Sequence, residues 1–188
     1  MINLEKAEKD IFLQSMSDVS DKLQFINRNL NDYLTFNNHY SLYIYRKDKE
    51  DNLQISARTT FENQKICITL YDGCFNGCYG LFKDKAYYAK GTIVHELAHV
   101  IDISHNYKFS DFFLEKLGGE YKQYKGNIRY FPVGYGIYKG TTKNGHVNHY
   151  DDFAESFATY IYGPSYDKQG FFVDNERLMT ISMLFESE

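Results

Sequence analysis

The first third of the chain changes from a helical to a strand-like pattern of apolar positions. From about residue 4 to residue 35, apolar residues step by three and four, beginning at Phe12 and Met16 and ending at Leu34. This spacing predicts one amphipathic helix that covers the core. Short runs of β-branched and aromatic residues then predict strands of a twisted antiparallel or mixed sheet. The predicted strands are Ser41–Arg46, Gln54–Phe61 and Lys65–Tyr71.

The rest of the chain returns to a helical pattern that glycine-rich segments interrupt. The glycines predict a loop at 72–80 and a long irregular loop at 125–148. Helical periodicity predicts helices that end before Gly118-Gly119 and Gly163-Pro164. These helices are expected at about 84–104 (starting at Asp84 or Ala86), 110–117, 150–162 and 175–185. The chain therefore reads as a single α+β domain over 1–188, with a helix and sheet part at 1–83 and a helical part at 84–188.

Composition narrows the classes of function. The chain has 43% apolar residues, enough for a good core, and its formal charge of -4 indicates no nucleic-acid partner. No apolar run approaches the roughly 18–20 residues that a membrane span needs. Three loosely spaced cysteines favour free thiols, with a Cys74–Cys78 disulfide across the Gly77 turn as the alternative.

The N-terminal residues bear on localisation. The segment MINLEKAEKD alternates charge and lacks the apolar core of an export signal. The chain as written is therefore expected to be cytoplasmic. It would be secreted instead if an upstream signal had been removed.

The predicted helix at 84–104 carries the segment 94-VHELAHVIDISH-105. His95 and His99 are four residues apart, so they share a helix face and can present two imidazoles to one zinc ion. Glu96 lies beside that ion and is placed to take a proton from a metal-bound water. The neighbouring positions are apolar, and three ionisable groups among them would be costly without a partner such as zinc. The segment predicts one zinc ion per chain; two ordinary hydrogen-bonded histidines are the alternative.

Two interpretations supply a third zinc ligand. His105 has the spacing of the metzincin pattern H-E-x-x-H-x-x-G-x-x-H, but Asp102 occupies the glycine position and no methionine-containing turn follows. Asp151 and Glu155 are four apart on a predicted aromatic-rich helix, where one could bind zinc while the other hydrogen-bonds a ligand histidine. Asp102 itself could orient a ligand histidine or serve as a surface or cap residue.

The segments HELAHVID and DDFAESFATY together resemble the gluzincin metallopeptidases of the anthrax lethal factor and Pro-Pro endopeptidase type. Those have H-E-x-x-H-x-x-D and, later, an acidic-x-F-A-E motif. The resemblance covers about residues 85–162. It implies Asp151 as the zinc ligand and Glu155 as the outer partner of the site. Because this chain has Asp where the family has Glu, Glu155 stays open as the ligand.

The resemblance also implies a fold and an oxyanion donor. The fold is zincin-like, with an N-terminal helix, a small twisted sheet of about three to four strands, an active-site helix and a mostly helical C-terminal half. The family places a tyrosine shortly before the acidic ligand, but Asn144 stands at that position here. Tyr138 is favoured as the donor because the glycine-rich segment could fold it over the site. Tyr150, His146 and His149 are the alternatives.

These observations predict a zinc endopeptidase in which Glu96 acts as the general base and Tyr138 as the oxyanion donor. Its substrate would be an extended peptide or protein segment held by main-chain pairing to a strand edge. Lys65–Tyr71 is the expected edge, since it precedes the active-site helix. The alternatives are a non-catalytic zinc-stabilised binding module on the same scaffold, a metzincin that uses His105, and a toxin-type protease domain cut from a larger secreted chain.

Overall fold

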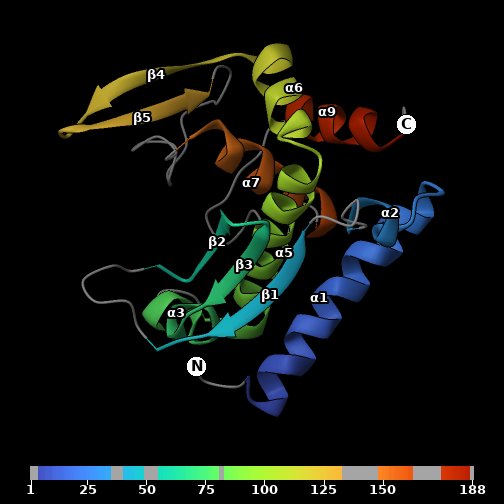
Figure 1. Ribbon diagram of the computed structural model, residues 1–188, viewed down its shortest axis with the longest axis vertical. Helices are drawn as coiled ribbons and strands as arrows, with labels where there is room; N and C mark the ends of the chain where they lie inside the picture. The colour runs from blue at the N-terminus through green and yellow to red at the C-terminus, as the bar shows by residue number, and fades with distance from the viewer. Residues whose placement is uncertain are drawn as a thin grey trace.

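A long helix, α5 (Lys85–Ser104), runs through the middle of the computed structural model (Figure 1). The sheet lies against one side of it, with α1 (Lys6–Phe25) beside them, and α7 (His149–Tyr162) packs closely on α5. The remaining helices are α2 (Leu30–Leu34), α3 (Asp72–Phe75), α4 (Gly77–Gly80), α6 (Lys108–Leu117) and α9 (Asn175–Glu186). The architecture is α+β, as predicted. The structure describes residues 4–34, 40–48, 55–80, 83–132, 148–162 and 175–186.

The main sheet is mixed and has three strands in the order β1-β3-β2. β1 (Ser41–Arg46) is parallel to β3 (Lys65–Leu70), and β2 (Ala57–Glu62) is antiparallel to β3. The prediction that the third strand offers a free edge to a substrate is therefore wrong, because β3 is paired on both sides. Its apolar side chains are almost all buried, as expected of a central strand, whereas the polar β2 forms the edge next to α5.

The hydrogen bonds of the sheet determine which β2 groups face outward. The Tyr71 amide donates to the Ser56 carbonyl at 3.0 Å, and continuing the β2–β3 register places these two residues directly opposite each other. In an antiparallel pair, bonded and non-bonded positions alternate along each strand. The β2 residues whose backbone groups point away from β3 are therefore Ala57, Thr59 and Phe61.

The N-terminal helical pattern belongs to two helices rather than the single helix expected over 4–35. The chain turns at Asn27, whose φ of 59° lies in the left-handed region that asparagine tolerates. The Asn29 side chain then accepts a hydrogen bond from the Asn31 amide at 2.9 Å at the start of α2. The apolar spacing continues across the break because Leu23 and Leu30 are buried in the same core.

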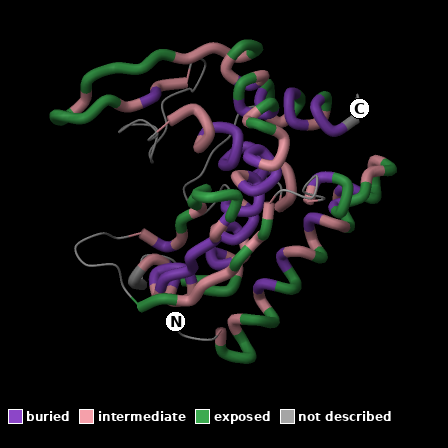
Figure 2. The backbone as a smooth tube through the Cα atoms, in the orientation of Figure 1, coloured by how far each residue is buried: buried purple, intermediate pink, exposed green. Residues whose placement is uncertain are grey.

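Both glycine-rich segments contain secondary structure that the sequence analysis missed. The expected loop at 72–80 forms the short helices α3 and α4. Part of the expected loop at 125–148 belongs to a hairpin of β4 (Gly119–Tyr124) and β5 (Asn127–Pro132). Its two-residue turn, Lys125-Gly126, has positive φ at both positions, the backbone form that closes tight hairpins. The hairpin projects from the body and is largely exposed (Figures 1 and 2).

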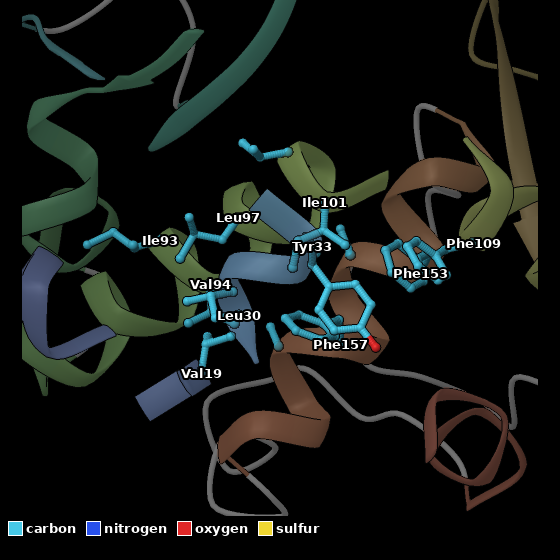
Figure 3. Packing of buried hydrophobic residues seen from close by; sticks show 14 of the residues in the cluster. Val19, Leu30, Tyr33, Ile93, Val94, Leu97, Ile101, Phe109, Phe153 and Phe157 are labelled. Carbon is cyan, nitrogen blue, oxygen red and sulfur yellow. The ribbon is translucent and has the colours of Figure 1, made fainter. Parts of the chain in front are cut away.

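The core holds α5 against its neighbouring helices, and burial is concentrated along α5 and α7 (Figure 2). Apolar side chains of α5 meet those of α1, α2, α6 and α7 in one cluster (Figure 3). The labelled members of this cluster are Val19, Leu30, Tyr33, Ile93, Val94, Leu97, Ile101, Phe109, Phe153 and Phe157. This packing fixes the relative position of α5 and α7, which carry the candidate site.

The three cysteines, Cys67, Cys74 and Cys78, are free thiols. The expectation of free thiols is confirmed, and no disulfide joins Cys74 to Cys78. Burial strongly raises the pKa of the Cys74 thiol, so this side chain behaves as a small apolar core residue.

Candidate metal centre

Three side chains from two helices bring donor atoms together. His95 and His99 lie one turn apart on α5, and their Nε2 atoms are 3.2 Å from each other. Asp151, in the first turn of α7, places Oδ1 at 3.4 Å from His99 Nε2. One donor atom from each residue lies within 4.8 Å of the other two, so this group could hold a metal ion. Of the two carboxylates left open by the sequence, Asp151 is the one in this group.

The spacing of the donor atoms suits a small tetrahedral ion. Zinc binds nitrogen and carboxylate oxygen at about 2.0–2.2 Å, so two ligands of a tetrahedral ion are about 3.3 Å apart. The distances of 3.2 Å between the two imidazole nitrogens and 3.4 Å between His99 and Asp151 agree with that value. The donor set of two imidazoles and one carboxylate also belongs to the sets that zinc favours in open sites.

Glu155 lies behind the histidine pair. Its Oε2 is 3.5 Å from His95 Nδ1, on the opposite side of the ring from the nitrogen that faces His99. The side chain is buried, and its Oε1 has no hydrogen-bond partner among the described residues. A carboxylate in this place can fix the tautomer and orientation of a metal-binding histidine. Asp151 therefore lies among the donor atoms (the inner position), and Glu155 contacts the far nitrogen of one donor residue (the outer position).

His105 is directed into the helix packing. Its Nδ1 lies 2.8 Å from the Ile101 carbonyl oxygen, and its ring packs on Phe109 at 4.9 Å and on Tyr33 at 5.7 Å between centroids. α5 also continues without a break to Ser104, whereas the metzincin pattern needs the helix to end near residue 102. His105 is not in the group of donor atoms that His95 and His99 join.

Asp102 caps the next helix from within the core. Its Oδ1 accepts hydrogen bonds from the amides of Phe109 and Ser110, each at 3.1 Å, at the start of α6. Burial raises the pKa of Asp102, although these bonds and the nearby His99 act in the opposite direction. Its Oδ2 is buried and has no hydrogen-bond partner among the described residues. The cap role expected as one alternative is thus present.

An open cleft of about 630 Å³ lies over the donor group. Residues of the edge strand β2 and of the start of α7 both line it. The lining residues include Ala57, Arg58, Thr59, Phe61, Glu96, Ile103, Tyr107, Asn148 and Tyr150 together with His95, His99 and Asp151. Glu96 is only 6% exposed, and its Oε2 accepts a hydrogen bond from the Thr59 hydroxyl at 2.6 Å. The cleft can therefore admit a ligand to the histidine pair and to Glu96 at once.

Acidic side chains make the site attractive to a cation. Burial alone would lower the pKa of His95, but its hydrogen bond with Glu155 and the charges of nearby carboxylates outweigh burial and raise the pKa to about 9. The carboxylates of Glu96 and Asp151 contribute to this effect. The negative electrostatic potential of these carboxylates, which stabilises the protonated ring, would also stabilise a bound metal cation.

A proton and a metal ion would therefore compete for His95, since a metal-bound imidazole must be neutral. With a pKa raised to about 9, the ring is protonated at neutral pH and loses its proton as the pH rises toward that value. Below a pH of about 9, we expect the apparent affinity for zinc to increase about tenfold for each unit by which the pH rises. Competition with a chromophoric chelator at several pH values measures this dependence, and a pH-independent affinity would contradict it.

The expected oxyanion donors occupy different places. Tyr138, His146 and the Asn144 position lie outside the described residues. Tyr150 lines the cleft and packs on Tyr107, with 4.8 Å between ring centroids. His149 is turned toward the hairpin instead.

His149 joins three elements at the root of the hairpin. Its Nδ1 lies 2.7 Å from the Tyr121 hydroxyl of β4, and its Nε2 lies 3.2 Å from Asp111 Oδ1 of α6. These contacts hold the first turn of α7 between α6 and β4. His149 thus has a structural environment that accounts for its polar atoms.

Sequence reasoning missed two contacts that shape the site. The Thr59 hydroxyl contacts Glu96 across 37 positions of the chain, and nothing in the strand pattern singled out this threonine. Arg177 of α9 pairs with Asp152 of α7, next to Asp151, through Nε–Oδ1 and Nη2–Oδ2 contacts of 2.9 and 3.2 Å. The arginine is 1% exposed, although its neighbours in sequence gave no sign of burial.

Comparison of the chain with models of known protein families, with curated proteins and with solved structures found no match. Among the described helices, none combines the length and apolarity that crossing a bilayer requires. The resemblance to gluzincins stays a hypothesis that rests on two short motifs.

Proposed function

We propose that the protein is a zinc-dependent endopeptidase of the gluzincin class. The observation that carries this proposal is the close approach of donor atoms from His95, His99 and Asp151, with Glu96 next to the two histidines on α5. Two helices from separate parts of the chain supply the donors, and a cleft opens over them. A carboxylate as the third ligand is what distinguishes the proposed class from metzincins.

The residues around the donor group would divide the chemistry between them. Zinc bound there would act as a Lewis acid toward the scissile carbonyl and would lower the pKa of the attacking water. Glu96 would take a proton from that water and pass it to the leaving amine. Glu155 would hold His95 in the tautomer that keeps Nε2 free for the ion.

The edge strand β2 supports an extended peptide as the substrate class. The backbone groups of Ala57, Thr59 and Phe61 point away from β3, and side chains of the same residues line the cleft. A peptide that added to this edge would form main-chain hydrogen bonds largely independent of its sequence. Its path would pass over the histidine pair. β2 thus replaces the third strand as the proposed substrate edge.

The main rival is a metal-stabilised binding module without catalysis. A purely structural zinc site is closed by four protein ligands. Glu155 would be the natural fourth ligand, but its Oε2 contacts His95 Nδ1 and its oxygens are not in the donor group. The three-residue group beside an open cleft therefore favours catalysis over a closed structural site.

Replacement of Glu96 by glutamine tests the proposal. Glutamine keeps the size of the side chain but cannot take a proton, so peptide cleavage should fall by at least about 100-fold. Glu96 is not in the donor group, so bound zinc should remain at about one ion per chain. Cleavage of a mixture of unstructured peptides, read by mass spectrometry with and without a chelator, measures the activity.

Glu120→Gln, an exposed change on β4, is the matched control and should leave cleavage unaltered. Equal cleavage by wild type and Glu96→Gln would show that Glu96 is not the base. Absence of any chelator-sensitive cleavage by the wild type, despite bound zinc, would favour the binding module.

A further inference from the structure

We propose that Thr59 is the positioning residue for Glu96, and that it links the seating of a peptide on β2 to the orientation of the general base. This inference rests on the proposed function and assigns a role to a residue outside the two motifs. It comes from one short hydrogen bond and from the place of Thr59 in the edge strand.

The contact fixes one of the two carboxylate oxygens of Glu96. The Thr59 hydroxyl lies 2.6 Å from Glu96 Oε2 and 3.3 Å from the Glu96 carbonyl oxygen. A hydroxyl has a single proton to donate, and a bond to a charged oxygen is the stronger choice. Thr59 therefore donates to Oε2, which leaves Oε1 to meet the reacting water.

The position of Thr59 in β2 also places it where a bound peptide would pair with the strand. Side chains alternate across a strand, so Thr59 faces Glu96 while its neighbour Thr60 faces the other side of the sheet. The backbone groups of Thr59 also belong to the outward set that would pair with a peptide. A peptide registered on β2 would thus be held by the residue that orients the base.

Such a link predicts an effect on turnover rather than on binding. Without the hydroxyl, Glu96 can rotate away from the water, and a misplacement of about 1 Å can cost on the order of 100-fold in rate. Backbone pairing to a peptide does not need the hydroxyl, so KM should change little. Among the described residues, the printed hydrogen bonds of the Thr59 hydroxyl go to Glu96 and to none of the proposed metal ligands, so metal content should stay the same.

Thr59→Val tests the inference, because valine keeps the shape of the side chain and removes only the hydroxyl. We expect kcat to fall about 10- to 100-fold, with KM and zinc content within about twofold of wild type. Thr59→Ser restores the donor and should keep kcat within a few-fold of wild type. Thr60→Val makes the same change on the opposite side of the strand and should have no effect.

The mechanism is checked in the Glu96→Gln background, where Thr59→Val should cause no further loss of kcat because the base is already absent. The ¹³C resonance of the Glu96 carboxyl, assigned by its disappearance in Glu96→Gln, should shift in Thr59→Val and not in Thr60→Val. Thr59→Ala repeats both readouts in case the valine variant folds poorly.

The outcomes separate this inference from the proposed function. An active wild type with kcat unchanged in Thr59→Val, or with an equal loss in Thr60→Val, would overturn the role of Thr59 alone. An unmoved Glu96 resonance would do the same without any activity assay. A wild type that binds zinc but cleaves no peptide would overturn the proposed function, and the role of Thr59 in catalysis with it.

Discussion

Replacing Asp151 with alanine is expected to abolish tight zinc binding and, with it, all metal-dependent cleavage. Asp151 is the member of the donor group that α7 contributes, with Oδ1 at 3.4 Å from His99 Nε2. Its loss would leave two imidazoles, too few protein ligands for a stable zinc site. The affinity should fall by more than the roughly 10–100-fold that is typical of losing an outer partner.

Elemental analysis after exhaustive dialysis, together with chelator competition, measures the change in Asp151→Ala. Glu155→Ala is the informative comparison, because loss of an outer partner should weaken zinc binding by about 10–100-fold without removing it. His105→Ala is the control, since the ring packs on Phe109 and Tyr33 away from the donor atoms.

Each other pattern of loss has a definite meaning. Loss of zinc in Glu155→Ala with retention in Asp151→Ala would exchange the inner and outer roles of the two carboxylates. Loss in His105→Ala alone would replace the gluzincin proposal by the metzincin interpretation. A wild type that takes up no zinc when the metal is supplied would end the enzyme proposal.

Replacing Arg177 with methionine should give the largest loss of folding stability, about 3–5 kcal/mol. The side chain is 1% exposed and makes a two-pronged contact with Asp152, itself 2% exposed. Methionine would fill much of the space but would leave a buried carboxylate without its cation. Because Asp152 adjoins Asp151, the change should also loosen the first turn of α7.

Urea unfolding of the metal-free protein measures this loss without a contribution from ligand binding. Lys116→Met, an exposed change on α6, is the matched control and should shift stability by no more than about 0.5 kcal/mol. Asp152→Leu combined with Arg177→Met removes both charges and should recover much of the loss. If Arg177→Met alone were as stable as wild type, the pair would not be holding α9 to α7.

The sequence was sufficient for the parts of the site that one helix determines. His95, Glu96 and His99 lie within five positions, so helical geometry alone places them together. The choice between Asp151 and Glu155 was not accessible in this way. Both share a face of α7 and differ by one methylene in reach, so the answer depends on how closely α7 approaches α5. That approach is set by the packing of residues such as Phe153 and Phe157, which no local pattern reports.

The strands show which signals were read and which were missed. The positions of β1 and β3 follow from their β-branched and aromatic runs, and those predictions are confirmed. The order of the strands was inferred from proximity in the chain to α5, which made the third strand the expected edge. Composition was the better guide, because KICITL is nearly apolar throughout and ARTTFE is largely polar. The Arg177–Asp152 pair was missed because an arginine and an aspartate look the same in the sequence whether their ion pair is buried or on the surface.

The packing of α7 on α5 also determines what an ion would contribute to the protein. The side chains that hold the two helices together are apolar and lie in the core, so the packing of α7 on α5 does not depend on a bound ion. The helices that carry the donor atoms are thus preorganised, and an ion bound there would lose little of its binding free energy to ordering the chain. Unlike a zinc finger, such a protein could release its ion and take up another while its fold persists. Under the proposed function, the supply of free metal around the protein would then set the fraction of molecules that is active.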